Sequence, residues 1–211
     1  MNVVFSLSLA VVFGLAPVVA AAGANAAKSA KTADVVDAAD VAQPATTAKP
    51  VKTDRLLGTR PPEWQATLWL NSRPLTLRAL RGQVVLVRWW TAGGCPFCAA
   101  SAPALRELND KFGKRGLTVV GMYHHKGAGP FDPADYRASA ETYGFTFPVA
   151  FDSAWRTLHS WLGGVDTGWT SVTFILDKRG FIRFVHPGGQ YVKGDTAYQE
   201  IHSVVERLLK E

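Results

Sequence analysis

The chain has 211 residues, of which 47% are hydrophobic and 19% charged, with a formal net charge of +6. This composition suits one globular domain with a sizeable core and added extensions. The basic excess is small and forms no block of consecutive Lys and Arg residues, so we expect no nucleic-acid partner.

The first residues predict export. Residues 3–22 are apolar and uncharged, and the small residues of "AAAGANAA" follow them. We therefore expect a signal peptide over residues 1–26 and a periplasmic or otherwise exported protein. No Lys or Arg precedes the apolar run, so a retained N-terminal anchor is the alternative. Membrane contact is expected only through this segment, and an oxidising compartment would permit disulfides.

Residues 27–55 are rich in Ala, Lys, Thr, Asp and Pro and nearly lack large apolar side chains. Such a stretch cannot bury enough surface to offset its ordering entropy, so we expect a disordered linker. The folded domain is predicted over residues 56–211.

Strands and helices alternate along that domain. Two short strands in a hairpin are expected at 65–70 and 74–77, followed by a strand at 82–90 that is buried on both faces. After the cysteines, apolar spacing predicts helices at 99–116, 132–144, 153–162 and 195–211, the second capped by Asp132 and the third by Ser153. Further strands are expected at 117–124, 147–152, 171–177 and 181–187, the last two as a hairpin. This order indicates an α/β fold with a mixed sheet.

Both cysteines of the chain, Cys95 and Cys98, lie where the buried strand gives way to a helix. A Gly-bearing turn precedes Cys95, and Pro96 occupies the favoured first helical position. Free N–H groups and the helix dipole favour a thiolate at Cys95. Cys98, one turn later, can close a disulfide with it, so the spacing supplies an attacking thiolate and a resolving partner.

Other roles for the pair fit less well. A disulfide between such near neighbours removes little unfolded-state entropy and is a poor structural staple. Structural zinc needs four ligands, and only two thiols exist. Attachment of a c-type haem is excluded because Ala99 stands where a histidine is required. We expect no cofactor and no metal.

The strand leading into "CPFC" resembles thioredoxin-like proteins, and the ordered segments "PLTLRALRGQVVLVRWW", "CPFCAASAPAL", "YGFTFPVAFD" and "VTFILDKRGFIRF" resemble the exported TlpA/ResA-like thiol–disulfide oxidoreductases. The resemblance implies a thioredoxin-like fold, with a mixed central sheet flanked by helices and an N-terminal hairpin extension. It implies Cys95 as nucleophile and Cys98 as resolving thiol. It also implies protein thiol or disulfide substrates, a membrane thiol-transfer partner, and reduction as the direction of exchange.

One departure from the family concerns the loop expected to face Cys95. The family has a proline, usually after a cis bond, where this chain has Ser171. A cis bond before a residue other than proline costs about 3–4 kcal/mol, so the Thr170–Ser171 bond is predicted to be trans. We expect Trp169, Thr170 and Ser171 to bind substrate. The serine hydroxyl can bond the Cys95 thiolate or leave room for a metal.

A second departure is the absence of a carboxylate near the cysteines. Related proteins have one on the central strand or just after the second cysteine, where this chain has Ser101. Gly94 replaces a family tryptophan, while Trp89 and Trp90 are expected to be buried in the strand. The acceptor for the Cys98 proton stays open between water and a distant histidine.

The histidines allow two interpretations. His124 and His125 end a predicted strand, where they can line the active-site face or bind metal, although an exposed polar loop is the simpler expectation. His186 is either structural or near the cysteines, and His159 and His202 are expected at the surface of helices.

The sequence favours thiol–disulfide exchange outside the cytoplasm and leaves two alternatives. A thiol peroxidase would need Thr three residues before the attacking cysteine, where this chain has Ala92 and Thr91 is off by one. Copper-carrying proteins of this fold usually have a longer cysteine spacing and a distant histidine.

Overall fold

The computed structural model describes residues 53–91 and 94–211. The predicted signal peptide and nearly all of the predicted linker lie outside these residues. The last residues of that linker, from Thr53, are part of a short 3-10 helix, η1 (Thr53–Leu56), whose Arg55 donates a hydrogen bond to the Gly163 carbonyl.

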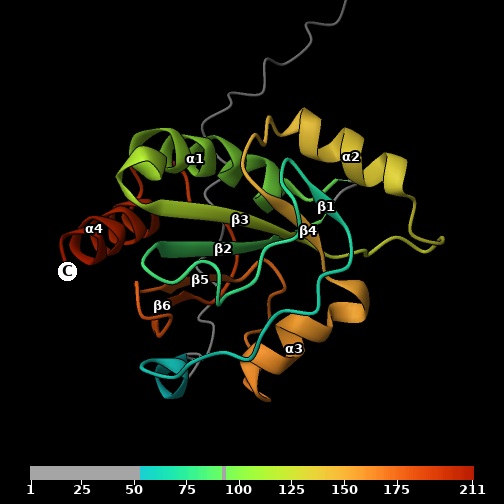
Figure 1. Ribbon diagram of the computed structural model, residues 1–211. Coiled ribbons are helices and arrows are strands. Elements are labelled where there is room, and N and C mark those ends of the chain that lie inside the picture. The colour runs from blue at the N-terminus through green and yellow to red at the C-terminus, as the bar shows by residue number, and fades with distance from the viewer. Residues whose placement is uncertain (1–52, 92–93) are drawn as a thin grey trace, which may run out of the picture. The chain divides into compact units, whose positions relative to one another are not determined.

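The elements follow the predicted alternation of strands and helices (Figure 1). The strands are β1 (Trp69–Leu70), β2 (Val84–Trp90), β3 (Leu117–Tyr123), β4 (Val149–Phe151), β5 (Thr173–Leu176) and β6 (Ile182–His186). The α-helices are α1 (Pro96–Phe112), α2 (Pro133–Thr142), α3 (Arg156–Leu162) and α4 (Thr196–Lys210), and the short 3-10 helices η2 (Gly113–Arg115) and η3 (Ser153–Trp155) precede β3 and α3.

The strands form one mixed sheet in the order β1-β4-β3-β2-β5-β6. β2, β3 and β4 are parallel, whereas β1 and β5 run antiparallel to their neighbours β4 and β2, and β6 runs antiparallel to β5. The carboxyl ends of β2 and β3 therefore meet at one edge, with Trp90 opposite Tyr123. The segment with the cysteines leaves the sheet there.

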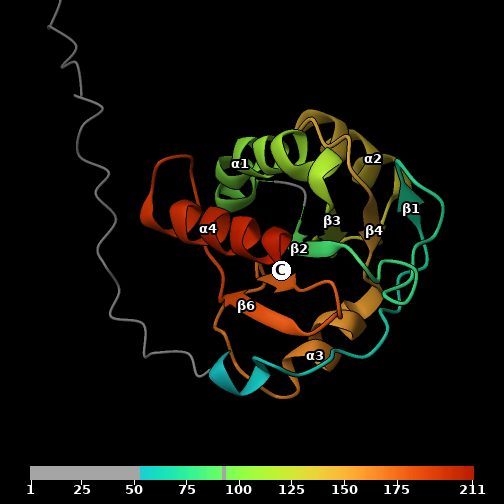
Figure 2. The same cartoon turned by 60° about the vertical axis from the view of Figure 1, so that its left-hand side comes forward.

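Two apolar clusters cover the two faces of the sheet. Val84, Leu86 and Trp90 of β2 pack with buried residues of α1, α2 and α4. Val85, Val87 and Trp89 point to the other face and pack with α3 and the segment before β2. Figures 1 and 2 show α1 and α3 on opposite sides of the sheet. β2 is thus buried on both faces, as its unbroken apolar sequence predicts.

The predicted N-terminal hairpin was wrong. Of that stretch only Trp69 and Leu70 form a strand, and they pair with the neighbouring strand β4 as the edge of the sheet. Residues 74–77 form no strand. Leu77, the last residue of that stretch, is instead buried with Trp64 in the cluster beside α3, so tertiary packing decides the conformation there.

The predicted Ser153 cap of the third helix was also wrong. Ser153 opens η3, and the buried carboxylate of Asp152 accepts hydrogen bonds from the backbone N–H groups of Thr157 and Leu158 at 2.9 and 3.0 Å. Its Oδ2 also accepts one from the indole N–H of Trp89 at 3.0 Å. Three donors satisfy this carboxylate and tie α3 to the central strand.

No helix in the described part of the chain is long and apolar enough to span a membrane.

Candidate active site

Cys95 caps the first turn of α1. Its backbone is extended, Pro96 begins the helix, and the Cys95 sulfur accepts a hydrogen bond from the backbone N–H of Cys98 at 3.2 Å. The predicted placement of Cys95 at a helix N-terminus is therefore confirmed. The two cysteines form a disulfide, with Cys95 partly exposed and Cys98 only 3% exposed. Only the first sulfur can readily be reached by a large substrate.

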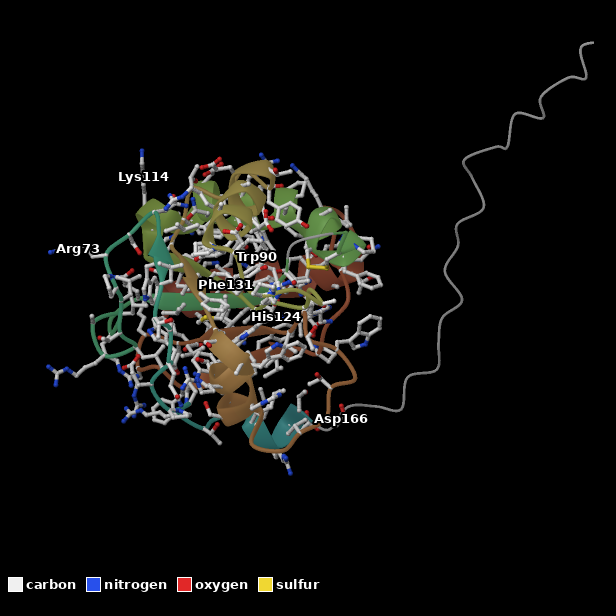
Figure 3. The ribbon with its side chains drawn as sticks, turned by 90° about the vertical axis from the view of Figure 1, so that its right-hand side faces the viewer. Arg73, Trp90, Lys114, His124, Phe131 and Asp166 are labelled. Atoms are coloured by element: carbon white, nitrogen blue, oxygen red, sulfur yellow. A yellow bond between two sulfur atoms is a disulfide. The ribbon has the colours of Figure 1, made fainter. Side chains whose placement is uncertain are left out.

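Two hollows meet at Cys95. The larger, about 690 Å³, lies toward β3 and α2 and is lined by Cys95, Phe97, Tyr123, His125 and Lys126 among others. The smaller, about 300 Å³, is lined by both cysteines, His124 and the loop from Gly168 to Ser171. Figure 3 shows the yellow disulfide beside the start of α1, with His124 labelled near it.

The loop of Trp169, Thr170 and Ser171 faces the cysteines, as predicted. All described peptide bonds are trans, including that between Thr170 and Ser171. The Trp169 ring meets the Phe97 ring edge to face, with centroids 5.1 Å apart. An aromatic pair from the loop and from α1 thus borders the smaller hollow.

The Ser171 hydroxyl bonds to backbone rather than sulfur. It accepts a hydrogen bond from the Gly189 N–H at 3.0 Å and lies 3.3 Å from the Gly189 carbonyl, to which it can donate. A bond from this hydroxyl to the Cys95 thiolate was one of two expected roles, and in the disulfide form the hydroxyl makes no bond to Cys95. Ser171 instead joins its loop to the loop after β6.

Sequence reasoning overlooked Arg88, which lies on β2 and is only 1% exposed. Its guanidinium donates hydrogen bonds to the carbonyls of Ser171 and Gly189, the latter at 2.6 Å. It also lies 3.4 Å from the Ser101 hydroxyl and 4.9 Å from the centre of the Tyr191 ring. The signal was a single charged residue within an apolar strand, because a charge is buried in such a run only when it has partners.

The expectation that His124 lies in an exposed polar loop was wrong. His124 is only 1% exposed, and its ring packs against the Trp155 ring with the two centroids 4.4 Å apart. Burial, and then the charges of Lys126 and His125, lower its pKa to about 3. The imidazole is therefore neutral near pH 7 and is a much weaker base than an ordinary histidine, which makes it a poor acceptor for the Cys98 proton.

The other histidines divide as follows. His125 is partly exposed and lines the larger hollow, and its Nε2 lies 2.8 Å from the Gly129 carbonyl. His186 is half-buried against Tyr191, with its pKa lowered to about 4 chiefly by burial. His159 is exposed, as predicted, whereas His202 is half-buried between Phe112 and Tyr198.

Burial of His124 predicts a loss of stability in mild acid. An unfolded histidine titrates near pH 6.5, whereas His124 in the folded protein stays neutral down to about pH 3. Below pH 6.5 the unfolded chain therefore binds a proton that the folded chain does not, and the free energy of unfolding falls. From pH 7 to pH 5 we expect protonation of His124 in the unfolded chain to lower the free energy of unfolding by about 2 kcal/mol.

The measurement is urea unfolding of the wild type, His124→Asn and the exposed-site control His159→Asn at both pH values. Between pH 7 and pH 5, the free energy of unfolding of His124→Asn should fall by about 2 kcal/mol less than that of the wild type or of His159→Asn. Equal losses in all three would show that His124 does not carry the effect.

Among residues 53–91 and 94–211, no group of three or more His, Cys, Asp or Glu side chains is placed to hold a metal ion. The copper-carrier alternative therefore gains no ligand set from the described residues.

Comparison with known proteins places this site in a family. The model of the AhpC/TSA family matches residues 57–185. Over 157 residues the chain is 28% identical to Protein DipZ of Mycobacterium tuberculosis, covering 73% of this chain and 21% of that protein. It is 29% identical over 119 residues to the chloroplastic Peroxiredoxin Q of Populus jackii, covering 55% of this chain and 53% of that protein. The chain thus spans about a fifth and about half of these relatives' lengths.

Solved structures show the same fold. A thioredoxin-like superfamily protein matches with a TM-score of 0.59 and 25% identity, covering 72% of this chain and 97% of that one. A thiol:disulfide interchange protein of the thioredoxin family from Chlorobium tepidum matches with a TM-score of 0.56 and 20% identity, with the same coverage. These matches confirm the predicted relationship to the thioredoxin-like superfamily and its fold. Because the family model matches more than half of its length, the chain belongs to the AhpC/TSA family, on a thioredoxin-like fold.

Proposed function

We propose that this protein is a thiol–disulfide oxidoreductase that exchanges disulfides with protein substrates through Cys95 and Cys98. The observation that supports this most is the unequal exposure of the two sulfurs at the start of α1. Cys95 lies where two hollows meet and Cys98 is buried behind it. A nucleophile must be reached by its substrate, whereas a resolving thiol only needs to reach the nucleophile.

In the reduced protein, the Cys95 thiolate attacks one sulfur of a substrate disulfide and forms a mixed disulfide. The second substrate sulfur leaves as a thiolate and takes a proton. Cys98 then loses its proton to water and attacks Cys95, which releases the substrate as a dithiol and leaves the disulfide seen in the structure. The Cys98 N–H and the positive end of the α1 helix dipole stabilise the Cys95 thiolate.

The resemblance to TlpA/ResA-like proteins supports reduction of substrates as the direction, with a membrane thiol-transfer protein as electron donor. The apolar first residues and the disulfide support an exported protein, with residues 1–26 as signal peptide or anchor, 27–55 as linker and 56–211 as the catalytic domain.

A thiol peroxidase is the second candidate, because the chain belongs to the AhpC/TSA family and is similar to Peroxiredoxin Q. Buried Thr91 also borders both hollows at Cys95. The two candidate functions can be distinguished by measuring the reduction of insulin disulfides and the consumption of hydrogen peroxide with the same dithiol donor. We expect insulin reduction well above the uncatalysed rate and peroxide consumption near it. The opposite ranking would favour the peroxidase.

Trp169 is predicted to bind substrate. Trp169 is 39% exposed and borders the hollow at Cys95 without contributing to the chemistry. Removing a contact of about 1 kcal/mol should therefore raise KM for a protein disulfide about fivefold in Trp169→Ala and leave kcat nearly unchanged.

The matched control is Leu57→Ala, which removes a similarly exposed apolar side chain that lines neither hollow. Reactivity toward a small aromatic disulfide should be equal in all three proteins. A fall in kcat with unchanged KM in Trp169→Ala would contradict a binding role.

A further inference from the structure

Arg88 is a buried cation without a buried anion. No carboxylate of the described residues forms an ion pair with it, since the carboxylates that do form ion pairs have other partners. Its hydrogen bonds go to two carbonyls and to hydroxyl groups, and its Nε has no hydrogen-bond partner. A buried charge of this kind is costly unless something compensates it.

Hydrogen bonds connect the guanidinium to the two segments that border the cysteine pair. Ser101 Oγ, 3.4 Å from Arg88 Nη2, donates to the carbonyl of Phe97 at 2.8 Å, and Phe97 stands between the two cysteines. On the other side Arg88 holds the carbonyl of Ser171, which lines the same hollow as both sulfurs. The Ser101 hydroxyl therefore connects the charge to the helical turn that carries the cysteines, and the Ser171 peptide connects it to the loop that faces them.

The remaining titratable groups near the guanidinium do not supply a counter-charge. Tyr191, from the loop after β6, stacks against it and is neutral, since burial raises the pKa of its phenol. His186 of β6 is near enough that the charge of Arg88 helps to lower its pKa to about 4, after the larger effect of burial. His124, across the hollow, is neutral near pH 7 because burial lowers its pKa to about 3.

We propose that the missing counter-ion of Arg88 is the thiolate formed when the Cys95–Cys98 disulfide is reduced, so that Arg88 sets the reduction potential of the pair. This inference rests on the proposed function. Reduction breaks the bond between the sulfurs with two electrons from a donor dithiol, which becomes a disulfide. Of the donor's two protons, one goes to Cys98 and one to water, and Cys95 keeps the negative charge.

The sign of the effect follows from which redox state carries the charge. The cation stabilises the thiolate, which exists only in the reduced protein, so Arg88 favours reduction and raises the potential. In Arg88→Met, which keeps an unbranched apolar stem and removes the charge, the pKa of the Cys95 thiol should rise by about one unit. At a pH above both thiol pKa values, the equilibrium constant for reduction by glutathione should then fall about tenfold, which corresponds to about 30 mV.

Arg88 is a positioning residue as well as a charge, so the test includes a variant that keeps the charge. Arg88→Lys loses part of the hydrogen-bond network but keeps the charge, so its equilibrium constant for reduction by glutathione should stay within about twofold of the wild-type value. Arg106→Met is the matched control, because it removes an arginine from the exposed side of α1 and changes the net charge equally. It should also stay within about twofold.

The inference fails if Arg88→Met shifts the equilibrium no more than Arg106→Met, or if Arg88→Lys shifts it as much as Arg88→Met. Should Arg88→Met not fold, the 15N resonance of Arg88 Nε in the wild type decides. It must move as the Cys95 thiolate titrates, and a constant resonance overturns the proposal. A wild-type disulfide that never equilibrates with glutathione refutes the proposed function itself, whereas normal exchange with unshifted variants refutes only the role of Arg88.

Discussion

Replacing Cys95 with serine is expected to abolish reduction of insulin disulfides, with a loss of at least about a thousandfold. A serine hydroxyl is not ionised near neutral pH and cannot attack a disulfide, so only the remaining thiol could act. That thiol belongs to Cys98, which is 3% exposed and lies behind Cys95. It is too buried to replace the nucleophile for a protein substrate.

The assay is the turbidity of precipitating insulin with dithiothreitol as electron donor, with the wild type and a protein-free sample beside the variant. Circular dichroism should show an unchanged fold, because the pair closes a very short loop and contributes little to stability. Substantial activity in Cys95→Ser would contradict Cys95 as the nucleophile.

Replacing Cys98 with serine should give a different defect, which is the second large effect. Cys95 remains partly exposed at the helix N-terminus, so it still attacks a disulfide once. Without the buried thiol, nothing within the protein releases the substrate, and the mixed disulfide accumulates. Turnover should fall at least about a hundredfold while one equivalent of substrate becomes attached.

Mass spectrometry after incubation with a disulfide peptide measures that attachment. One added peptide thiol per chain is expected for Cys98→Ser and none for Cys95→Ser, which serves as the control. The roles of the two cysteines would be reversed if Cys95→Ser became labelled and Cys98→Ser did not.

The part of the site that follows from local chemistry could be predicted from the sequence. The apolar run of β2, the glycine-bearing turn and Pro96 together place Cys95 at the start of α1. The steric cost of a cis bond before a serine predicts the trans bond at Ser171. These features depend on neighbours in the chain, and they were confirmed.

The errors arise where distant segments meet. Residues 74–77 have strand-like composition, yet Leu77 is buried beside α3 and the segment forms no strand. His124 follows a strand as a loop residue would, but Trp155, 31 positions later, covers its ring. The Ser171 hydroxyl bonds to Gly189, whose position next to it depends on the β5–β6 hairpin. No local pattern specifies such contacts.

Arg88 combines a feature that the sequence shows with contacts that only the fold shows. Its presence in an apolar strand is visible in the sequence and indicates a buried charge with partners. Its partners, the carbonyls of Ser171 and Gly189, lie 83 and 101 positions further along the chain. The sequence therefore indicates that Arg88 is a buried charge, and only the fold identifies the loops near the cysteines to which it bonds.

The most direct test of a working redox pair is the reduction potential of the Cys95–Cys98 disulfide in the wild-type protein. Equilibration with dithiothreitol or glutathione buffers, followed by alkylation of free thiols, gives the reduced fraction at each potential. We expect a single two-electron transition with a midpoint above about −300 mV, and near about −270 mV if the pair reduces its substrates as thioredoxin does. A disulfide that stays oxidised well below about −300 mV would be a structural cross-link and would contradict the proposed function.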